Sequence, residues 1–244
     1  MERKVEVAII GAGTAGLAAM GQAKRAGKDF VLINGGELGT TCARVGCMPS
    51  KALIQVAHDL HRREVFGREG IEGGESLSAS LPDTLEHVRD MRDILVDRVL
   101  GHTTDQMGDE FMDGYARFIE PGVLQVGEDT IHAASVVTAC GTRPAVPPAW
   151  VDFGERILTS DTIFEQEDLP DAIAVVGLGV IGLEIGQALA HLGVSVTGID
   201  MLDTIAGLRD PDARRSAIEL MERAFPIWLG HEAELFEDEG RIRV

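Results

Sequence analysis

Cysteine is scarce in this sequence, which has only three in 244 residues: Cys42, Cys47 and Cys140. Disulfide frameworks belong to small secreted chains that are dense in cysteine, so this chain does not fit that class. A structural zinc site would require four ligands in paired short spacings, and the sequence has no second cysteine pair, so no metal site is expected. Cys42 and Cys47 nevertheless lie five residues apart, directly before a Pro-Ser-Lys helix opening at residues 49–51. A redox-active pair is the interpretation that remains.

The sequence also lacks a long apolar run and an excess of basic residues. No stretch of about 18 apolar residues free of charge is present, so no segment is expected to span a bilayer. The start, MERKVEVAIIGAGTAGLAAM, imitates a signal peptide, but glycines interrupt its apolar run, so we expect no export signal and a cytoplasmic location. Forty acidic residues against 22 basic ones give a net charge of −18. This charge repels nucleic acid and anionic lipid, so we expect neither as a partner.

What the sequence does contain is an internal repeat at an offset of 166 residues. Each copy, at residues 7–34 and 172–200, runs from a short apolar strand through a glycine-rich turn and a helix to a second apolar strand. The offset superposes the turn glycines and the residue that ends the second strand: Gly11 on Gly177, Gly13 on Gly179, Gly16 on Gly182, and Asn34 on Asp200. One such pattern is weak evidence for dinucleotide binding, because a tight strand-to-helix turn can by itself require these glycines. Two in register favour dinucleotide binding.

The chemistry of dinucleotide binding explains each position of the pattern. The first glycine permits the turn, the second lets backbone N–H groups approach a pyrophosphate, and the third lets helix and strand pack closely. The helix N-terminus adds partial positive charge. Asp200 is expected to accept the ribose hydroxyls and to repel a 2′-phosphate, which favours NAD over NADP. Asn34 can still hydrogen-bond a ribose but brings no charge, so we expect weaker affinity at the first turn.

Between the two copies, hydrophobic spacing predicts helices and strands. A helix is expected over residues 50–66, with a buried face of Leu53, Val56, Ala57 and Leu60. A second helix is expected over residues 81–106, with an inward face of Leu85, Val88, Met91, Leu95 and Val99. Residues 67–80, rich in glycine and serine, predict a loop, and residues 116–139 predict short strands with turns at Pro121-Gly122 and Gly127. The segment 141–150 is expected to separate two domains, at residues 1–149 and 150–244.

The string TTCARVGCMPSK at residues 40–51, between two glycine turns, is the most specific element of the sequence. VVTACGTRP at residues 136–144 and GVIGLEIG at residues 179–186 are further matching pieces. Over residues 5 to about 215 the chain resembles the class I, flavin-dependent pyridine nucleotide-disulfide oxidoreductases, and within that family the dihydrolipoamide dehydrogenases. The resemblance implies an α/β fold of two Rossmann-like domains, FAD-binding at 1–149 and NAD-binding but incomplete at 150–244, with no terminal dimerisation domain.

The resemblance assigns catalytic roles to four residues. It implies that Cys47 lies against the flavin as a thiolate, a form that a helix start and a nearby lysine favour, and that Cys42 exchanges with the substrate disulfide. Lys51 matches a lysine near the flavin N5 edge, and Glu184 matches the carboxylate that pairs with it near the nicotinamide. The alternative for Lys51 and Glu184 is a solvated surface ion, and the alternative for the two cysteines is a pair of unrelated buried thiols.

The dinucleotide contacts that the resemblance implies are more numerous. For FAD they are Gly11, Gly13, Thr14, Ala15, Gly16, Asn34, Gly35, Gly39, Thr40, Thr41, Lys51, Ala116, Cys140 and Gly141, and for NAD they are Gly177, Gly179, Val180, Ile181, Glu184 and Asp200. Cys140 stands where the family usually has threonine, and as a small residue at a strand end it is expected in the core rather than in catalysis. Histidines such as His58, His61 and His191 lie on helical patterns and are expected to have no metal-binding role.

The function that the resemblance implies is disulfide oxidoreduction. Electrons from a dithiol, either a small molecule such as dihydrolipoamide or a lipoyl-protein, reduce the Cys42–Cys47 disulfide, pass to FAD and leave as hydride to NAD⁺. Family members are homodimers that extend beyond the equivalent of residue 244, into a further flavin-binding segment and a domain with a His-Glu acid-base pair. We therefore expect a fragment with little turnover. A mercuric or other disulfide reductase and a non-catalytic dinucleotide-binding module are the alternatives.

Overall fold

The structure, a computed structural model, describes residues 1–244 and divides the chain into two compact units. The first unit comprises Met1–Met48 and Asp90–Ala145, and the second comprises Pro49–Arg89 and Val146–Val244. Pro49–Arg89 groups with the later residues because its apolar side chains, including Leu53 and Leu85, belong to their hydrophobic core. The compact units therefore differ from the two sequence segments 1–149 and 150–244, whose assignment to FAD and NAD stays a prediction.

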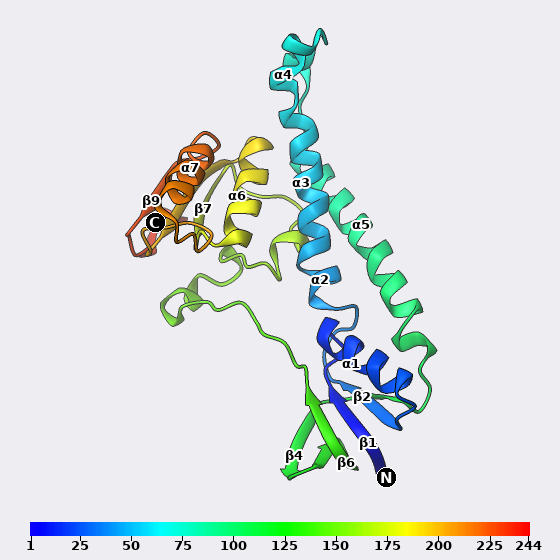
Figure 1. Cartoon of the computed structure of the whole chain (residues 1–244). Coiled ribbons are helices and arrows are strands. Elements are labelled where there is room, and N and C mark those ends of the chain that lie inside the picture. Colours follow the sequence, from blue (N-terminus) through cyan, green and yellow to red (C-terminus); the bar gives the residue numbers. More distant parts are fainter. The chain divides into compact units, whose positions relative to one another are not determined.

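The first unit contains a six-stranded sheet and helix α1 (Thr14–Arg25), drawn in blue and green in Figure 1. The strands are β1 (Glu2–Ile10), β2 (Phe30–Asn34), β3 (Phe111–Asp113), β4 (Ala116–Glu120), β5 (Val123–Val126) and β6 (Asp129–Thr138), in the sheet order β3-β2-β1-β6-β5-β4. Strands β3, β2, β1 and β6 run parallel, and β4 and β5 are antiparallel. Strand β1 begins earlier than expected because its first residues pair with β6, Glu2 lying opposite Thr130.

The central strands β1 and β2 form the core of the first unit. Successive side chains of a strand point to opposite faces, so Phe30 and Leu32 lie in one apolar cluster with residues of α1, whereas Val31 and Ile33 lie in another. All four are buried, as expected of a parallel strand covered on both faces. Each fully buried side chain of this size stabilises the fold by about 1.5–3 kcal/mol.

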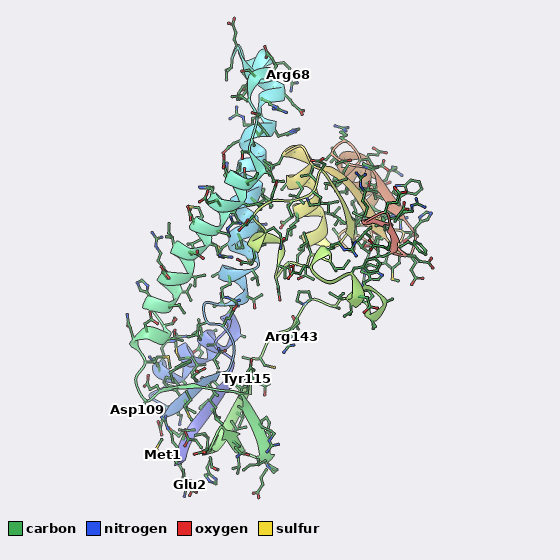
Figure 2. All side chains as sticks on the ribbon, turned by 180° about the vertical axis from the view of Figure 1, so that it is seen from behind. Met1, Glu2, Arg68, Asp109, Tyr115 and Arg143 are labelled. Carbon is green, nitrogen blue, oxygen red and sulfur yellow. The ribbon has the colours of Figure 1, made fainter.

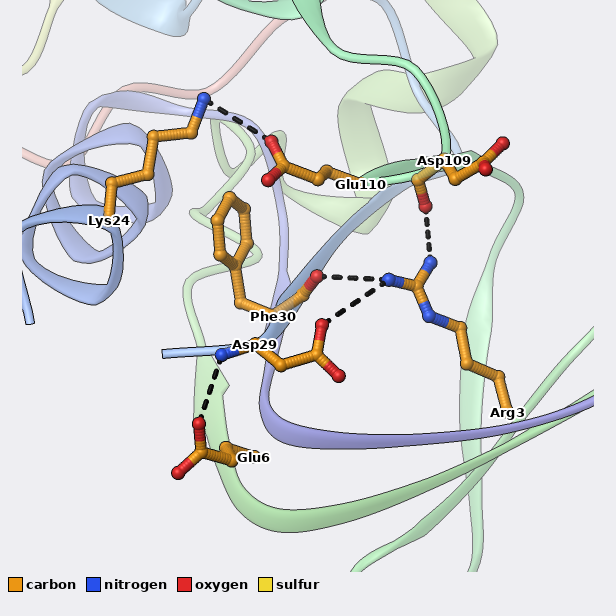
Figure 3. A network of polar contacts seen from close by, with 7 residues as sticks. All are labelled: Arg3, Glu6, Lys24, Asp29, Phe30, Asp109 and Glu110. Atoms are coloured by element: carbon orange, nitrogen blue, oxygen red, sulfur yellow. Dashed lines mark hydrogen bonds and ion pairs between the residues drawn. The ribbon is translucent and has the colours of Figure 1, made fainter. Parts of the chain in front are cut away.

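A network of polar contacts ties the start of β1 to the residues before β2 and β3 (Figure 3). The Arg3 guanidinium donates to the carbonyl oxygens of Phe30 and Asp109 and lies 3.8 Å from the Asp29 carboxylate. Glu6 accepts from Lys28 Nζ at 2.7 Å and from the Asp29 N–H at 3.0 Å. The Lys28 hydrogen bond holds the pKa of Glu6 below its ordinary value. These contacts lie at the amino ends of the strands, so none of them involves the carboxyl ends, where the glycine turn follows β1.

The second unit contains a three-stranded parallel sheet in the order β7-β8-β9. Its strands and the helices that follow them are β7 (Ala172–Val176), α6 (Val180–His191), β8 (Ser195–Asp200), α7 (Pro211–Met221) and β9 (Ile227–Leu229). Asp210 caps α7 by accepting the N–H groups of Asp212 and Ala213, and Pro211 suits the first helical position. A hairpin of β10 (Phe236–Asp238) and β11 (Arg241–Arg243) follows. The α/β fold expected from the sequence is confirmed.

The chain contains further helices. They are α2 (Thr41–Arg44), α3 (Cys47–His61), α4 (Arg63–Glu69) and α5 (Leu81–Gly101), with short 3₁₀ helices at Gly74–Ser76, Thr104–Gln106, Pro148–Arg156 and Ile163–Glu165. The boundary between the units falls within α3 and again within α5. None of the helices combines the length and the apolar character that a membrane-spanning segment needs.

Four expectations about these helices were wrong in detail. The helix expected over 50–66 is divided at Arg62, although the backbone there keeps helical angles, φ −55° and ψ −23°. Gly67 lies inside α4 and not in a loop, because the left-handed residue that ends the helix is Gly70. The helix expected to reach residue 106 ends at Gly101, and Met91, expected inward, is 40% exposed. The 3.6-residue period turns Arg92 inward instead, with its side chain only 12% exposed.

Candidate functional site

The first glycine turn, between β1 and α1, leaves no room for side chains at two of its three glycines. The Gly11 N–H donates to the Ile33 carbonyl at 2.7 Å, and a Cβ at Gly11 would lie 2.3 Å from the Ala139 carbonyl oxygen. A Cβ at Gly16 would lie 1.8 Å from the Gly11 carbonyl oxygen. At Gly13, by contrast, an added Cβ meets nothing within 4 Å. Helix α1 starts there without a side-chain cap, so the turn offers backbone N–H groups to a phosphate.

The second glycine turn, between β7 and α6, has similar backbone angles, although a Cβ at Gly177, unlike one at Gly11, meets nothing within 4 Å. Gly177 has φ +97°, close to the +104° of Gly11, and a Cβ at Gly182 would lie 2.1 Å from the Gly177 carbonyl oxygen. An added Cβ at Gly179 again meets nothing within 4 Å, and α6 also begins without a side-chain cap. Val180 and Ile181, in the first turn of α6, are exposed. Each turn therefore fits the close approach of a dinucleotide pyrophosphate.

Asn34 and Asp200 occupy the end of the second strand in the two copies. Asn34 Oδ1 accepts the N–H of Ala12 at 3.0 Å, and Asp200 Oδ2 accepts the equivalent N–H of Leu178 at 2.7 Å. The other half of each side chain contacts the residue two positions further on, with opposite polarity. Asn34 Nδ2 donates to the Gly36 carbonyl at 2.6 Å, whereas Asp200 Oδ1 accepts the Leu202 N–H at 2.8 Å.

The segment from Gly35 to Cys47 follows strand β2 and contains both cysteines of the pair. A Cβ at Gly35 would lie 2.6 Å from the ring of Tyr115, an exposed residue labelled in Figure 2. Cys42 lies half-buried in α2, and Cys47 begins α3. A hydrogen bond with the Cys47 side chain raises the pKa of the Cys42 thiol, and burial of Cys42 adds to the rise. Both cysteines are thiols in the structure, in contact with each other.

Cys140 does not lie in the core, which corrects one expectation from the sequence. It is exposed, because it is the second residue after the end of β6, where the chain leaves the sheet. Its backbone N lies 3.1 Å from the position of a Cβ at Gly11, so the polypeptide at Cys140 borders the first glycine turn. Gly141 continues with φ +67°, and Ala116 is half-buried at the start of β4. The chain at Ala139 and Cys140 is therefore close-packed at Gly11.

Lys51 of α3 and Glu184 of α6 form an ion pair in the second unit. Lys51 Nζ lies 2.7 Å from Glu184 Oε1, and the two side chains are 56% and 37% exposed. This contact is the pairing that the resemblance implied, between two side chains that stay partly exposed to solvent. The catalytic role of the pair stays a prediction.

A histidine cluster extends from this ion pair along α3 and α6. The rings of His61 and His191 stack with centroids 3.8 Å apart and an interplanar angle of 2°, and His58 lies 6.5 Å from His191. A pocket of about 360 Å³ connects the cluster to the ion pair, and its lining is Lys51, Ile54, Ala57, His58, Glu184, Gln187, Ala188 and His191. No group of His, Cys, Asp or Glu has the geometry of a metal site.

Sequence reasoning missed this cluster, although a signal was present. His58 follows Lys51 by seven residues and His191 follows Glu184 by seven, which is close to two helical turns. If Lys51 and Glu184 pair, the same offset on both helices brings His58 and His191 together. His191, which the helical pattern left without a role, lines the contact with α3.

The residues expected to contact the two cofactors divide between the units. The first unit holds Gly11, Gly13, Thr14, Ala15, Gly16, Asn34, Gly35, Gly39, Thr40, Thr41, Cys42, Cys47, Ala116, Cys140 and Gly141. The second unit holds Lys51, Gly177, Gly179, Val180, Ile181, Glu184 and Asp200. Within each unit, the glycine turn and the residue at the end of the second strand are in direct contact.

Comparison with known proteins gives consistent relatives. The chain is 32% identical over 216 residues to dihydrolipoyl dehydrogenase 2, chloroplastic, of Arabidopsis thaliana, covering 87% of this chain and 38% of the relative. It is 30% identical over 255 residues to dihydrolipoyl dehydrogenase 2 of Haloarcula marismortui, covering 98% and 52%. It is also 30% identical over 222 residues to a soluble pyridine nucleotide transhydrogenase of Mycobacterium bovis, covering 86% and 46%. The chain thus spans about half the length, or less, of these relatives.

A solved structure has a similar fold. The Cu(II) complex of the HOCl-induced flavoprotein disulfide reductase RclA from Escherichia coli superposes with a TM-score of 0.81 at 22% identity, covering 98% of this chain and 52% of that one. The sequence also matches the profile of the pyridine nucleotide-disulphide oxidoreductase family over residues 5–241. Because that match covers nearly the whole sequence and includes both glycine turns and the cysteine pair, the chain belongs to the pyridine nucleotide-disulphide oxidoreductase family.

Proposed function

We propose that this chain forms the FAD- and NAD-binding part of an oxidoreductase that passes electrons between a dithiol of the dihydrolipoamide class and NAD, through Cys42 and Cys47. The observation that carries the proposal is the contact between the side chains of Cys42 and Cys47, in the segment that follows strand β2. The two thiols favour a dithiol or disulfide substrate over exchange between nucleotides alone.

The two glycine turns support the binding of two dinucleotides. Gly13 and Gly179 leave open space where a pyrophosphate approaches, while Gly11, Gly16 and Gly182 permit the close-packed turns. In the proposal the first turn, with Thr14, Ala15 and Asn34, holds FAD, and the second, with Val180, Ile181 and Asp200, holds NAD. When bound, the flavin would supply the two-electron chemistry that links a dithiol to hydride transfer with the nicotinamide.

Asp200 is the residue that selects NAD in this proposal. Each carboxylate oxygen accepts one backbone N–H, from Leu178 or Leu202, and a carboxylate oxygen has lone pairs for a second donor. The backbone bonds orient the carboxylate, and the remaining lone pairs are available to the ribose hydroxyls. Because the group is anionic, a 2′-phosphate at the same place would be repelled.

The cysteine pair performs thiol–disulfide exchange in the proposal. A substrate thiolate attacks Cys42 Sγ of the oxidised pair, the bond between the two cysteine sulfurs breaks, and Cys47 leaves as a thiolate. The second substrate thiol then attacks the mixed disulfide, which releases Cys42 as a thiol and the substrate as a disulfide. Two electrons have passed from the substrate to the cysteines. In this reduced state the hydrogen bond with Cys47 raises the pKa of Cys42, which favours the thiol form of Cys42.

The test combines flavin retention with the redox state of each cysteine. The purified chain is loaded with excess FAD and passed through gel filtration, and the flavin-to-protein ratio is measured. Trypsin cleaves after Arg44 and Lys51, so Cys42 and Cys47 fall in separate peptides, residues 29–44 and 45–51. The air-oxidised, flavin-loaded chain should give these two peptides joined by a disulfide, with Cys140 alkylated.

Anaerobic NADH or dihydrolipoamide should then make both peptides alkylatable, with bleaching of the flavin in the NADH experiment. Cys42→Ser and Cys47→Ser should remove the disulfide, and Cys140→Ser is the matched control that should not. Three alkylatable cysteines in the oxidised, flavin-loaded chain would contradict the proposal. Flavin and NADH binding without any disulfide would support a dinucleotide-binding module instead.

A further inference from the structure

Thr40 has a backbone conformation that is unusual for its residue type. Its φ is +65° and its ψ is +146°. Only Ala206 and Glu239 share a positive φ among the non-glycine residues, and neither has a β-branched side chain. A β-branched residue in this region is a steric outlier, and such outliers persist only where the surroundings hold them.

The contacts around Thr40 hold this conformation. Thr40 Oγ1 accepts the N–H of Ala43 at 3.1 Å, and the Thr40 carbonyl accepts the N–H of Arg44 at 3.0 Å. The preceding residue, Gly39, also has a positive φ, and a Cβ there would lie 2.7 Å from a methyl group of Val96. Two consecutive residues therefore wind the chain into α2 (Thr41–Arg44), and the Thr40 hydroxyl closes that turn.

Helix α2 carries Cys42 and cannot shift freely. Ala43 is buried, and a Cβ at Gly46 would lie 3.0 Å from the Thr41 carbonyl oxygen and 3.4 Å from Cys42 Cα. The chain before Cys47 thus packs directly against the backbone that carries Cys42. Thr40 fixes the start of the helix that carries Cys42, and the close packing at Gly46 fixes the chain that leads into Cys47.

We propose that Thr40 is a positioning residue, whose left-handed backbone and capping hydroxyl hold the Cys42 thiol against Cys47. The inference deepens the proposed function, and it rests on that function only for the role of Cys42 as the exchanging thiol. Its geometric part concerns the reduced chain and involves no cofactor.

The test is the pH profile of alkylation of each cysteine in the reduced full chain. Iodoacetamide labelling of Cys42 is read in the tryptic peptide 29–44, and labelling of Cys47 in the peptide 45–51. Three variants separate the features of Thr40: Thr40→Ser keeps the hydroxyl, Thr40→Val keeps the branched shape without it, and Thr40→Gly removes the hydroxyl and the steric conflict. Asp210→Ala is the matched control, because it removes the capping bonds of α7 in the second unit.

If Thr40 positions Cys42, Thr40→Ser reproduces the Cys42 profile of the unsubstituted chain. Thr40→Val and Thr40→Gly shift that profile to lower pH, because Cys42 loses its contact with Cys47 and part of its burial. A merely structural role would lower the stability of these variants and leave the profile unchanged, which would overturn the proposal. Thr40→Gly tests it even if Thr40→Val does not fold. If the Cys42 profile shifts as expected in these variants but the unsubstituted chain transfers no electrons, the proposed function is refuted and the positioning role of Thr40 stands.

Discussion

Asp200 closes the second glycine turn, because its Oδ2 accepts the backbone N–H of Leu178 over 2.7 Å. Its counterpart Asn34 makes the same contact in the first turn, with the N–H of Ala12. The second contact of each side chain differs in polarity: Asp200 accepts a backbone N–H, and Asn34 donates to a backbone carbonyl. The carboxylate of Asp200 and the amide of Asn34 therefore each fit the backbone groups around them, and exchanging the two residues would leave a mismatched hydrogen bond in each turn.

Exchanging the two side chain types should destabilise both turns. In Asp200→Asn, one backbone N–H faces an NH₂ group, and in Asn34→Asp the carboxylate faces the Gly36 carbonyl. We expect each substitution to lower the free energy of unfolding by about 1 kcal/mol, the net value of one hydrogen bond. Asp200→Asn should also weaken NADH binding by about 1.5–3 kcal/mol, because it would remove the charged group proposed to accept hydrogen bonds from the ribose hydroxyls.

Urea unfolding and titration of NADH fluorescence measure these two effects. Asp171→Asn is the control for Asp200→Asn, since Asp171 is exposed at the start of the same sheet. It should leave both quantities unchanged. An Asp200→Asn chain that binds NADH and NADPH with the affinities of the unsubstituted chain would show that Asp200 does not contact the ribose.

The glycines of the first turn should separate folding from dinucleotide binding. An added Cβ at Gly13 meets nothing, so Gly13→Ala should fold normally. It should lose FAD affinity by about tenfold or more, equivalent to about 1.4 kcal/mol, since the methyl group would occupy the space proposed for the pyrophosphate. At Gly16 the Cβ would overlap the Gly11 carbonyl, and Gly16→Ala should lose about 3 kcal/mol or more of stability. Flavin retention after gel filtration, read beside a urea titration, distinguishes the two. Gly13→Ala with unaltered flavin retention would place FAD elsewhere.

The ion pair between Lys51 and Glu184 should matter for chemistry more than for stability. Both side chains are more than one third exposed, so solvent screens their attraction, and Lys51→Met should lower the free energy of unfolding by less than about 1 kcal/mol. If the pair acts at the flavin and nicotinamide, Lys51→Met and Glu184→Gln should slow flavin reduction by NADH in stopped-flow measurements. Lys28→Met is the matched control, because it removes the ion pair with Glu6, also 2.7 Å long, from the far end of the strands. If Lys51→Met and Glu184→Gln reduce flavin at the same rate as Lys28→Met, the ion pair has no role in that step.

The sequence predicts the glycine turns well because backbone constraints there are local. Both α1 and α6 span 12 residues and begin directly after the second glycine, as the repeat required. Helix ends elsewhere depended on which glycine adopts the left-handed conformation, and composition alone does not distinguish Gly67 from Gly70. The grouping of Pro49–Arg89 with the second unit depends on contacts with residues more than 70 positions away, which hydrophobic periodicity does not report.

The candidate site shows the same limit. The cysteine spacing predicted a reactive pair, and the structure adds their hydrogen bond. The strain at Thr40 is not readable from the sequence, because threonine is not a residue that a positive φ favours. The stacked pair of His61 and His191 required knowing that α3 and α6 pack together, which follows from the Lys51–Glu184 contact and from no local pattern.

That histidine cluster should make the stability of the second unit depend on pH. Burial lowers the pKa of His191 below its ordinary value of 6.5, the nearby His61 and His58 add to the decrease, and Glu64 opposes it. His191 Nδ1 is also buried without a hydrogen-bond partner, and Glu64 contacts His61 Nδ1 at 3.2 Å. The unfolded chain therefore binds more protons than the folded chain between the lowered pKa and 6.5.

Because the unfolded state binds the additional proton, stability is full above pH 6.5 and decreases as the pH falls towards the lowered pKa of His191. His191→Leu should flatten this part of the stability curve, since it removes the titrating ring and keeps an apolar contact for His61. His87→Gln is the control, because His87 is exposed on α5 and should leave the slope unchanged. Urea unfolding at intervals from pH 5 to 8 measures the slope. A slope that is the same in His191→Leu as in the unsubstituted chain would show that protonation of His191 is not linked to unfolding.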